Sequence, residues 1–199
     1  QPHWTDDEYF DACAKFADEH GQAARDKGGD FHSLCQQFHE RCQNGNGLPF
    51  AVSVANEHNL RPQFDAYAEW YFKNIRRSLM VEQTVIGDGY AGRVDHVAEL
   101  PDGRIACLDV KTQDISKKKG RFTFYDTWPV QLGAYAGAIK PMPDCLMSVA
   151  VSTNSPVVIE AQVWERPVTY YHNLFLGLLA FWKHSNKYFP ETPNPKGTM

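Results

Sequence analysis

Two short turn sequences constrain the fold more than any other feature of the chain. Asp88-Gly89 separates residues 79–86 from residues 90–100, and Pro101-Asp102-Gly103 separates these from residues 104–111. Asp-Gly between two strand-like runs is a strong hairpin signal, and a three-residue loop that ends in Gly is a second one. The chain therefore predicts a three-stranded antiparallel meander whose register depends on the lengths of its turns.

Counting outward from these turns brings three carboxylates into one row. A two-residue first turn places Glu82 opposite Asp95, and a three-residue second loop places Asp95 opposite Asp109. Opposed residues of neighbouring strands have Cβ atoms ~5 Å apart, so these carboxylates repel one another. Strand alternation puts Lys111 on the same face as Asp109. A slip of one residue, for example through a bulge at Gly92, would break the row.

A row of like charges is tolerated where a cation neutralises it. Hard oxygen ligands at this spacing suit Mg²⁺ or Mn²⁺, as one ion or as two with Glu82 as an added ligand. Such a site suits phosphodiester hydrolysis, with Lys111 orienting the attacking water or stabilising the charged transition state. The alternative is a solvated charged sheet face on which Lys111 only pairs with Asp109.

Helical periodicity flanks the meander on both sides. The predicted helices are residues 5–24, a second helix after a break at Gly28-Gly29, and residues 62–77, 128–138 and 168–188; two further strands are residues 145–152 and 157–163. We expect one α/β domain, a mixed central sheet flanked by helices. Its parts are the helical residues 1–78, the sheet core 79–163 and the C-terminal helix 164–189.

Composition narrows the class of protein. The longest apolar run has nine residues, against the ~20 of a membrane-spanning helix, and no secretory leader opens the chain. Five cysteines without a Cys-x-x-Cys predict reduced thiols in an intracellular protein. The net charge of −4 argues against a broadly basic nucleic-acid-binding protein, yet residues 111–121 hold five basic residues and one aspartate.

That basic segment directly follows the strand that carries Lys111. We expect its cations to bind DNA phosphates and the aromatic residues after them to stack on the bases of a single strand. The cations are Lys117, Lys118, Lys119 and Arg121, and the aromatic residues are Phe122, Phe124, Tyr125 and Trp128. The alternatives are a solvated loop and a set of core aromatics.

Several ordered motifs resemble those of the PD-(D/E)XK nuclease superfamily, in particular its RecB-like exonuclease branch. They are Gly28-Gly29-Asp30-Phe31-His32, Gly89-Tyr90-Ala91-Gly92-Arg93-Val94-Asp95, Leu108-Asp109-Val110-Lys111-Thr112 and Gln131-Leu132-Gly133-Ala134-Tyr135. The match covers over half of the chain, with Val94 in place of the nominal Pro. Residues 125–138 are especially similar to the mitochondrial genome maintenance exonuclease group and its phage and bacterial relatives.

The resemblance implies a restriction-endonuclease-like core and a role for each matching residue. Asp95, Asp109, His32 and the Val110 carbonyl would be metal ligands, Glu82 would be the acidic residue before the Asp strand, Lys111 would be the catalytic lysine, and Gln131 and Tyr135 would support the site and contact DNA. The branch that carries an iron–sulfur cluster has cysteines after Q-x-x-x-Y. Since only Cys145 follows that motif here, no iron–sulfur cluster is expected.

These features predict a Mg²⁺- or Mn²⁺-dependent DNA exonuclease that acts on single-stranded DNA or strand ends in DNA repair, recombination or replication. One alternative is a structure-specific or restriction-like endonuclease of the same fold, and another is a non-catalytic nucleic-acid-binding module. We expect no membrane partner. The expected compartment is the cytoplasm of a bacterial or phage host, or the mitochondrion if a targeting segment has been removed.

Overall fold

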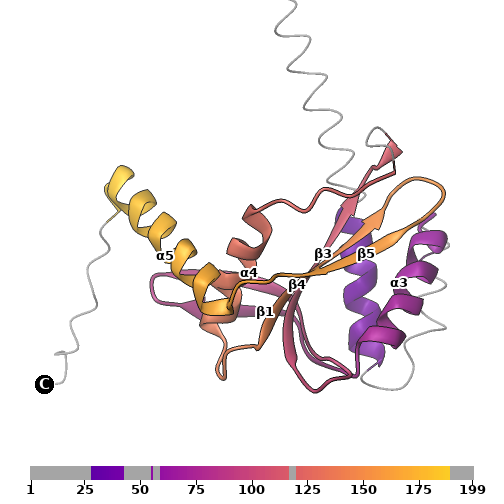
Figure 1. Cartoon of the computed structure of the whole chain (residues 1–199), viewed down its shortest axis with the longest axis horizontal. Coiled ribbons are helices and arrows are strands. Elements are labelled where there is room, and N and C mark those ends of the chain that lie inside the picture. The colour runs from indigo at the N-terminus through magenta and orange to yellow at the C-terminus, as the bar shows by residue number, and fades with distance from the viewer. Residues whose placement is uncertain (1–27, 43–54, 56–58, 117–119, 189–199) are drawn as a thin grey trace, which may run out of the picture.

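The computed structural model describes residues 28–42, 55, 59–116 and 120–188 (Figure 1). Its helices are residues 28–42, α3 (Arg61–Asn74), α4 (Thr127–Ala138) and α5 (Val168–Ser185). Its strands are β1 (Arg77–Gly87), β2 (Tyr90–Glu99), β3 (Ile105–Gln113), β4 (Cys145–Ser152) and β5 (Ile159–Val163). The predicted α/β class with a mixed sheet is confirmed.

The five strands form one sheet in the order β1-β2-β3-β4-β5, antiparallel except for the parallel pair β3–β4. Every residue of β4 is buried, as expected for a strand with neighbours on both edges and helices over the sheet. Its hydroxyls are satisfied there: Ser148 Oγ accepts a hydrogen bond from Trp164 Nε1 at 3.1 Å, and Ser152 Oγ accepts one from the Val158 amide at 2.8 Å.

The register of the meander follows the turn lengths, as predicted. Gly87 pairs with Tyr90 across the first turn, and the Leu100 amide donates to the Arg104 carbonyl across the second. A register shift does occur between β1 and β2, but between Ser78 and Met80, so no bulge forms at Gly92. Counted from the first turn, Glu82 therefore keeps its predicted position opposite Asp95.

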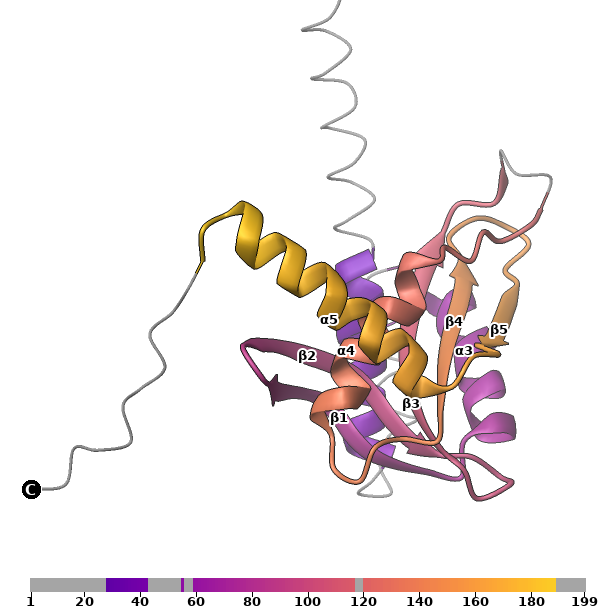
Figure 2. The ribbon, with the colours of Figure 1, turned by 60° about the vertical axis from the view of Figure 1, so that its left-hand side comes forward.

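Helices cover the sheet on both faces (Figure 2). One core contains side chains of residues 28–42 and α3, including Phe38 and Phe64, against Leu108 and Val110 of β3. The other core contains side chains of α4 and α5 against the opposite face, where Cys107 lies. Burial of each large apolar side chain contributes ~1.5–3 kcal/mol, so both layers hold β3 in place.

The predicted helix break at Gly28-Gly29 is wrong, because both glycines are helical. A Cβ atom on Gly28 would lie 3.3 Å from Thr112 Oγ1, so the missing side chain lets this helix approach β3 closely. The sequence signal for a chain break instead marks a close contact between a helix and the sheet. β1 also begins at Arg77, the last residue of the segment predicted to be helical and two residues before the predicted strand.

Four predicted features lie outside the described residues: the helix 5–24, the loop 44–49, the lysines Lys117, Lys118 and Lys119, and the tail 190–199. Among the helices that the structure describes, none has both the length and the apolar character needed to cross a bilayer.

Two histidine rings are buried face to face between residues 28–42 and β2. The ring centroids of His39 and His96 lie 4.2 Å apart, and the ring planes are 17° from parallel. His39 Nε2 lies 2.9 Å from Tyr67 Oη, and His96 Nε2 lies 2.7 Å from Ser78 Oγ. Burial lowers the pKa of both histidines, that of His96 to about 3, so both rings are neutral at pH 7.

We expect this stack to make the folded state lose stability below pH ~6.5. The unfolded chain binds a proton at His96 near pH ~6.5, whereas the folded chain does so only near pH 3. The contribution of the neutral His96 ring to the free energy of unfolding is therefore complete above pH ~6.5. It falls by about 1.4 kcal/mol per pH unit on acidification. Urea unfolding at pH 7 and pH 5 should show a smaller loss in His96→Leu than in the wild type, and equal losses would contradict this expectation.

Candidate metal and catalytic site

β2 and β3 separate at the position where the sequence predicts Asp95 and Asp109 to face each other. The ladder between these strands ends at the pair His96–Leu108, one step before the two aspartates. Beyond it, Asp95 Oδ2 accepts a hydrogen bond from the Val110 amide at 3.3 Å. A side-chain carboxylate thus replaces a backbone carbonyl as acceptor, and the strands leave room for polar side chains between them.

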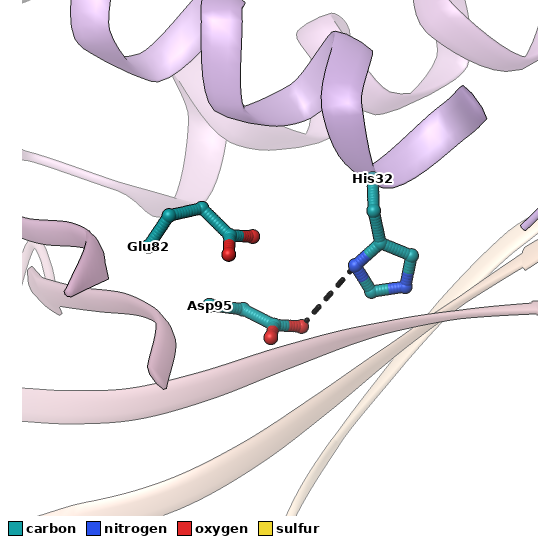
Figure 3. Close-up of side chains that lie close together, drawn as sticks. All are labelled: His32, Glu82 and Asp95. Atoms are coloured by element: carbon teal, nitrogen blue, oxygen red, sulfur yellow. Dashed lines mark ion pairs between the residues drawn. The ribbon is translucent and has the colours of Figure 1, made fainter. Parts of the chain in front are cut away.

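His32, Glu82 and Asp95 form one cluster beside this opening (Figure 3). One ligand atom of each lies within 4.8 Å of the others, and His32 Nδ1 lies 3.4 Å from Asp95 Oδ2. Glu82 has a positive φ of 47°, a left-handed conformation that is unfavourable for a residue with a side chain. This strained residue within β1 directs its carboxylate into the cluster.

Asp109 is the most deeply buried carboxylate of the site, with 2% of its surface exposed. Its Oδ1 accepts a hydrogen bond from Lys111 Nζ at 2.7 Å, whereas its Oδ2 is buried without a hydrogen-bond partner among the described residues. Burial raises the pKa of Asp109 to about 7; Lys111 opposes this shift and Asp95 adds to it. Among the described residues, none donates a hydrogen bond to this buried carboxylate oxygen.

His32 is positioned to be a neutral ligand. Burial lowers its pKa below the usual value, and this outweighs the opposite effects of Asp95 and of a hydrogen bond with the Val110 backbone. A neutral imidazole offers a lone pair to a metal ion, which a protonated one does not. His32 belongs to the helix 28–42, which packs close to β3 because Gly28 has no side chain.

Lys111 is held from two sides. Its ammonium contacts Asp109 and lies 6.0 Å from the ring centroid of Trp128, at the outer limit of a cation–π contact. The indole packs edge-on against Phe124, which in turn packs against Trp164 of the core. Phe124 and Trp128 are thus partly buried against the core, whereas Tyr125 is half exposed.

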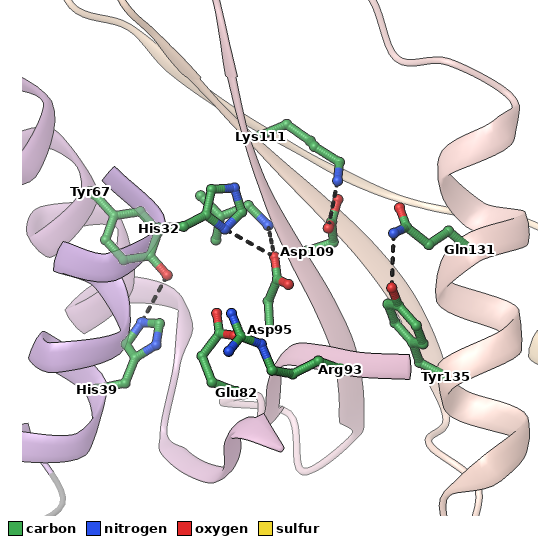
Figure 4. Close-up of polar contacts among 11 residues, drawn as sticks. His32, His39, Tyr67, Glu82, Arg93, Asp95, Asp109, Lys111, Gln131 and Tyr135 are labelled. Atoms are coloured by element: carbon green, nitrogen blue, oxygen red, sulfur yellow. Dashed lines mark hydrogen bonds and ion pairs between the residues drawn. The ribbon is translucent and has the colours of Figure 1, made fainter. Parts of the chain in front are cut away.

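Gln131 and Tyr135 form the opposite wall of the site (Figure 4). Gln131 Nε2 donates a hydrogen bond to Tyr135 Oη at 2.9 Å. The tyrosine ring lies over Gly92, where a Cβ atom would come within 2.5 Å of it. Gly92, on the same strand as Asp95, therefore gives α4 its close approach. Figure 4 shows Asp95, Asp109 and Lys111 between this helix and the one that carries His32.

The structure brings most of the predicted site residues together. His32, Glu82, Asp95, Asp109, Val110, Lys111, Gln131 and Tyr135 all line or adjoin the opening between β2 and β3. Arg121 is exposed in the segment between β3 and α4, and Lys117, Lys118 and Lys119 lie outside the described residues.

Sequence reasoning missed Arg93, whose Nε lies 2.7 Å from Glu82 Oε2. A signal for this contact was available. Arg93 is two residues from Asp95 on the same strand, so it shares a face with Asp95 and is the diagonal neighbour of Glu82 across the hairpin.

The donor set fits a hard divalent cation. Three carboxylates and one imidazole come from four elements: Glu82 from β1, Asp95 from β2, Asp109 from β3 and His32 from the helix 28–42. Glu82, Asp95 and His32 cluster together, and Asp109 Oδ2 is buried without a partner in the described part of the chain. Such oxygen-rich sets with one nitrogen suit Mg²⁺ or Mn²⁺ better than soft metals.

No family model matches this chain, and no curated protein matches it. Among solved structures, the crystal structure of SSO0001 is similar over 82% of this chain and 82% of its own chain, at 12% identity and a TM-score of 0.34. A likeness at that level carries no argument about this protein.

We expect Asp109→Asn to stabilise the metal-free protein at pH 8. The unfolded chain ionises Asp109 near pH ~3.9, whereas the folded chain resists this until about pH 7. The wild type therefore loses stability as the pH rises between these values, and the amide does not. Calorimetry in EDTA should show a Tm higher by about 2 °C or more.

Asp102→Asn is the matched control for this measurement. Asp102 is exposed in a turn, and its contacts with Arg104 lower its pKa, so its replacement should not raise the Tm. If Asp109 is a metal ligand, added Mn²⁺ should raise the Tm of the wild type more than that of Asp109→Asn, because a ligand of the folded state alone stabilises that state. A lower Tm for Asp109→Asn in EDTA would contradict the assignment of Asp109 as an unfavourable buried charge.

Proposed function

We propose that this chain is a metal-dependent deoxyribonuclease, an exonuclease with a restriction-endonuclease-like core that acts on single-stranded DNA or strand ends in DNA repair, recombination or replication. The observation that carries the proposal is the burial of the Asp109 carboxylate. Its Oδ1 accepts a hydrogen bond from Lys111, and its Oδ2 has no partner among the described residues. A fold has no structural use for such a group, because a buried carboxylate without full compensation destabilises it.

The ligands of the proposed site come from both sides of the opening. Asp95 and Asp109 would hold Mg²⁺ or Mn²⁺, as one or two ions, together with His32, Glu82 and the Val110 carbonyl. When bound, the ion would activate a water molecule and neutralise charge that grows on the phosphate. In such a hydrolysis the water oxygen would bond to phosphorus as the bond from phosphorus to the sugar oxygen breaks, and the proton that the water loses would pass through solvent to the departing sugar oxygen.

Lys111 is the residue best placed to act on the reacting phosphate. Its side chain is 24% exposed, so the ammonium reaches solvent while Asp109 and Trp128 limit its movement. An ammonium held in place can orient the attacking water or stabilise the charge of the transition state without reorganising during the reaction. A passive binding surface does not require this fixed geometry.

Two features support a nucleic-acid substrate. The ordered motifs in the sequence resemble those of RecB-like exonucleases, and the matching residues lie around one opening. An open groove of about 600 Å³, largely apolar, also adjoins Gln131 and Tyr135 between α4, α5 and the start of β2. Unpaired bases suit such a surface, since they are apolar on both faces, whereas a duplex exposes mainly phosphates and sugars.

We expect Lys111→Ala and Asp109→Ala each to reduce Mn²⁺-dependent cleavage of single-stranded DNA by at least ~100-fold, because they remove transition-state stabilisation and a metal ligand. Cleavage of end-labelled strands, with circular dichroism to confirm folding, measures the effect. Lys140→Ala, an exposed lysine in the segment between α4 and β4, is the matched control and should retain activity. Undiminished cleavage by folded Lys111→Ala would refute the mechanism.

Circular single-stranded DNA distinguishes an exonuclease from an endonuclease of the same fold. We expect the wild type to degrade a linear strand and to leave the circle of the same sequence intact. Cleavage of the circle at a comparable rate would assign endonuclease activity instead. Binding of both substrates in Mn²⁺ without cleavage of either would favour a non-catalytic binding module.

A further inference from the structure

Glu82 takes part in two interactions that compete for its carboxylate once a metal ion binds. Its carboxylate belongs to the cluster with His32 and Asp95, where one atom of each residue lies within 4.8 Å of the others. The same carboxylate forms an ion pair with the Arg93 guanidinium, whose Nε lies 2.7 Å from Glu82 Oε2 (Figure 4). In the described structure Arg93 therefore supplies the positive charge that a metal ion would supply.

The contact between Arg93 and Glu82 is easily broken from the arginine side. The arginine side chain is 65% exposed, whereas that of Glu82 is 9% exposed. Glu82 is held in place by its strand and by burial, while the guanidinium can turn into solvent at little cost. Burial and Asp95 raise the pKa of Glu82 and Arg93 lowers it, so this carboxylate benefits from a cation at either position.

A divalent cation at Glu82 and Asp95 would repel the guanidinium beside it. The repulsion frees an arginine at the edge of the site, two residues before Asp95 on the same strand and on the same face. The guanidinium has a fork of donors that matches phosphate geometry and is always charged. A phosphate that reaches the metal site arrives beside this free arginine.

We propose that Arg93 is a phosphate-binding residue that a divalent cation releases from Glu82. This inference rests on the proposed function for the identity of the anion, a phosphate of the nucleic-acid strand. The order of events follows from charge: Arg93 neutralises Glu82 before the metal binds, the metal then takes over that role, and Arg93 binds the strand. Metal binding and strand binding are thereby coupled through one side chain.

The proposal predicts opposite effects of one substitution on two affinities. Arg93→Gln removes the cation that competes with the metal for Glu82. We therefore expect Mn²⁺ to bind up to ~10-fold more tightly when it is titrated alone by calorimetry. The same substitution removes a phosphate contact, so the affinity for a single-stranded 20-nucleotide oligothymidylate in Mn²⁺ should fall several-fold. Its logarithmic dependence on salt should become shallower by about 0.7.

The strand measurement is made by fluorescence anisotropy in a Lys111→Ala background, so that cleavage does not interfere. Arg77→Gln is the matched control: Arg77 is 67% exposed and pairs with Glu99 at 2.9 Å at the other end of the β1–β2 ladder. It should change neither affinity. Arg93→Lys should keep the salt dependence and recover part of the strand affinity, because it retains the charge without the fork.

Only tighter Mn²⁺ binding together with weaker strand binding supports the proposal. Unchanged Mn²⁺ affinity, or weaker binding of both ligands, would overturn it, as would tighter Mn²⁺ binding with unchanged strand affinity. Both measurements are independent of turnover. If the wild type cleaves DNA but Arg93→Gln has the same two affinities as Arg77→Gln, this inference alone is refuted. If Arg93→Gln shifts the two affinities in opposite directions but the wild type never cleaves DNA, the nuclease proposal alone is refuted.

Discussion

The repulsion between carboxylates at the point where β2 and β3 separate determines how the rest of the site is arranged. If the ladder continued by one more pair, Asp95 and Asp109 would face each other at ~5 Å, which is unfavourable. The ladder stops before them, and each acquires a different partner. Asp95 accepts a hydrogen bond from the Val110 amide and lies close to His32, whereas Asp109 accepts a hydrogen bond from Lys111. The opening that results is the candidate site.

The compensation of these charges is incomplete. One oxygen of Asp109 has no partner within the described residues. Glu82 adopts an unfavourable left-handed backbone conformation. Such unfavourable features persist where the surrounding structure determines them, and they cluster at functional sites. Here the two cores on either face of the sheet provide the necessary stability, with β4 buried along its whole length beside β3.

The helix of residues 28–42 connects the core to the site. His32 and His39 lie seven residues apart, two helical turns, and so share one side of the helix. His39 stacks on His96 in the core, and His96 is the residue next to Asp95 on β2. The imidazole that faces Asp95 is thus held by the same helix that is anchored to the strand carrying that aspartate. The approach depends on Gly28, which lies against Thr112.

The meander, its register and the row of charged residues along it could be predicted from the sequence alone. Turn lengths and strand alternation are local properties, so they place Glu82, Asp95, Asp109 and Lys111 along one row without knowledge of the rest of the fold. The burial and the partners of these residues come from the tertiary structure. The burial of Asp109 and the approach of His32 to Asp95 depend on helices packed from distant parts of the chain. Burial and desolvation set the energy of a charge, and both arise only when such elements come together.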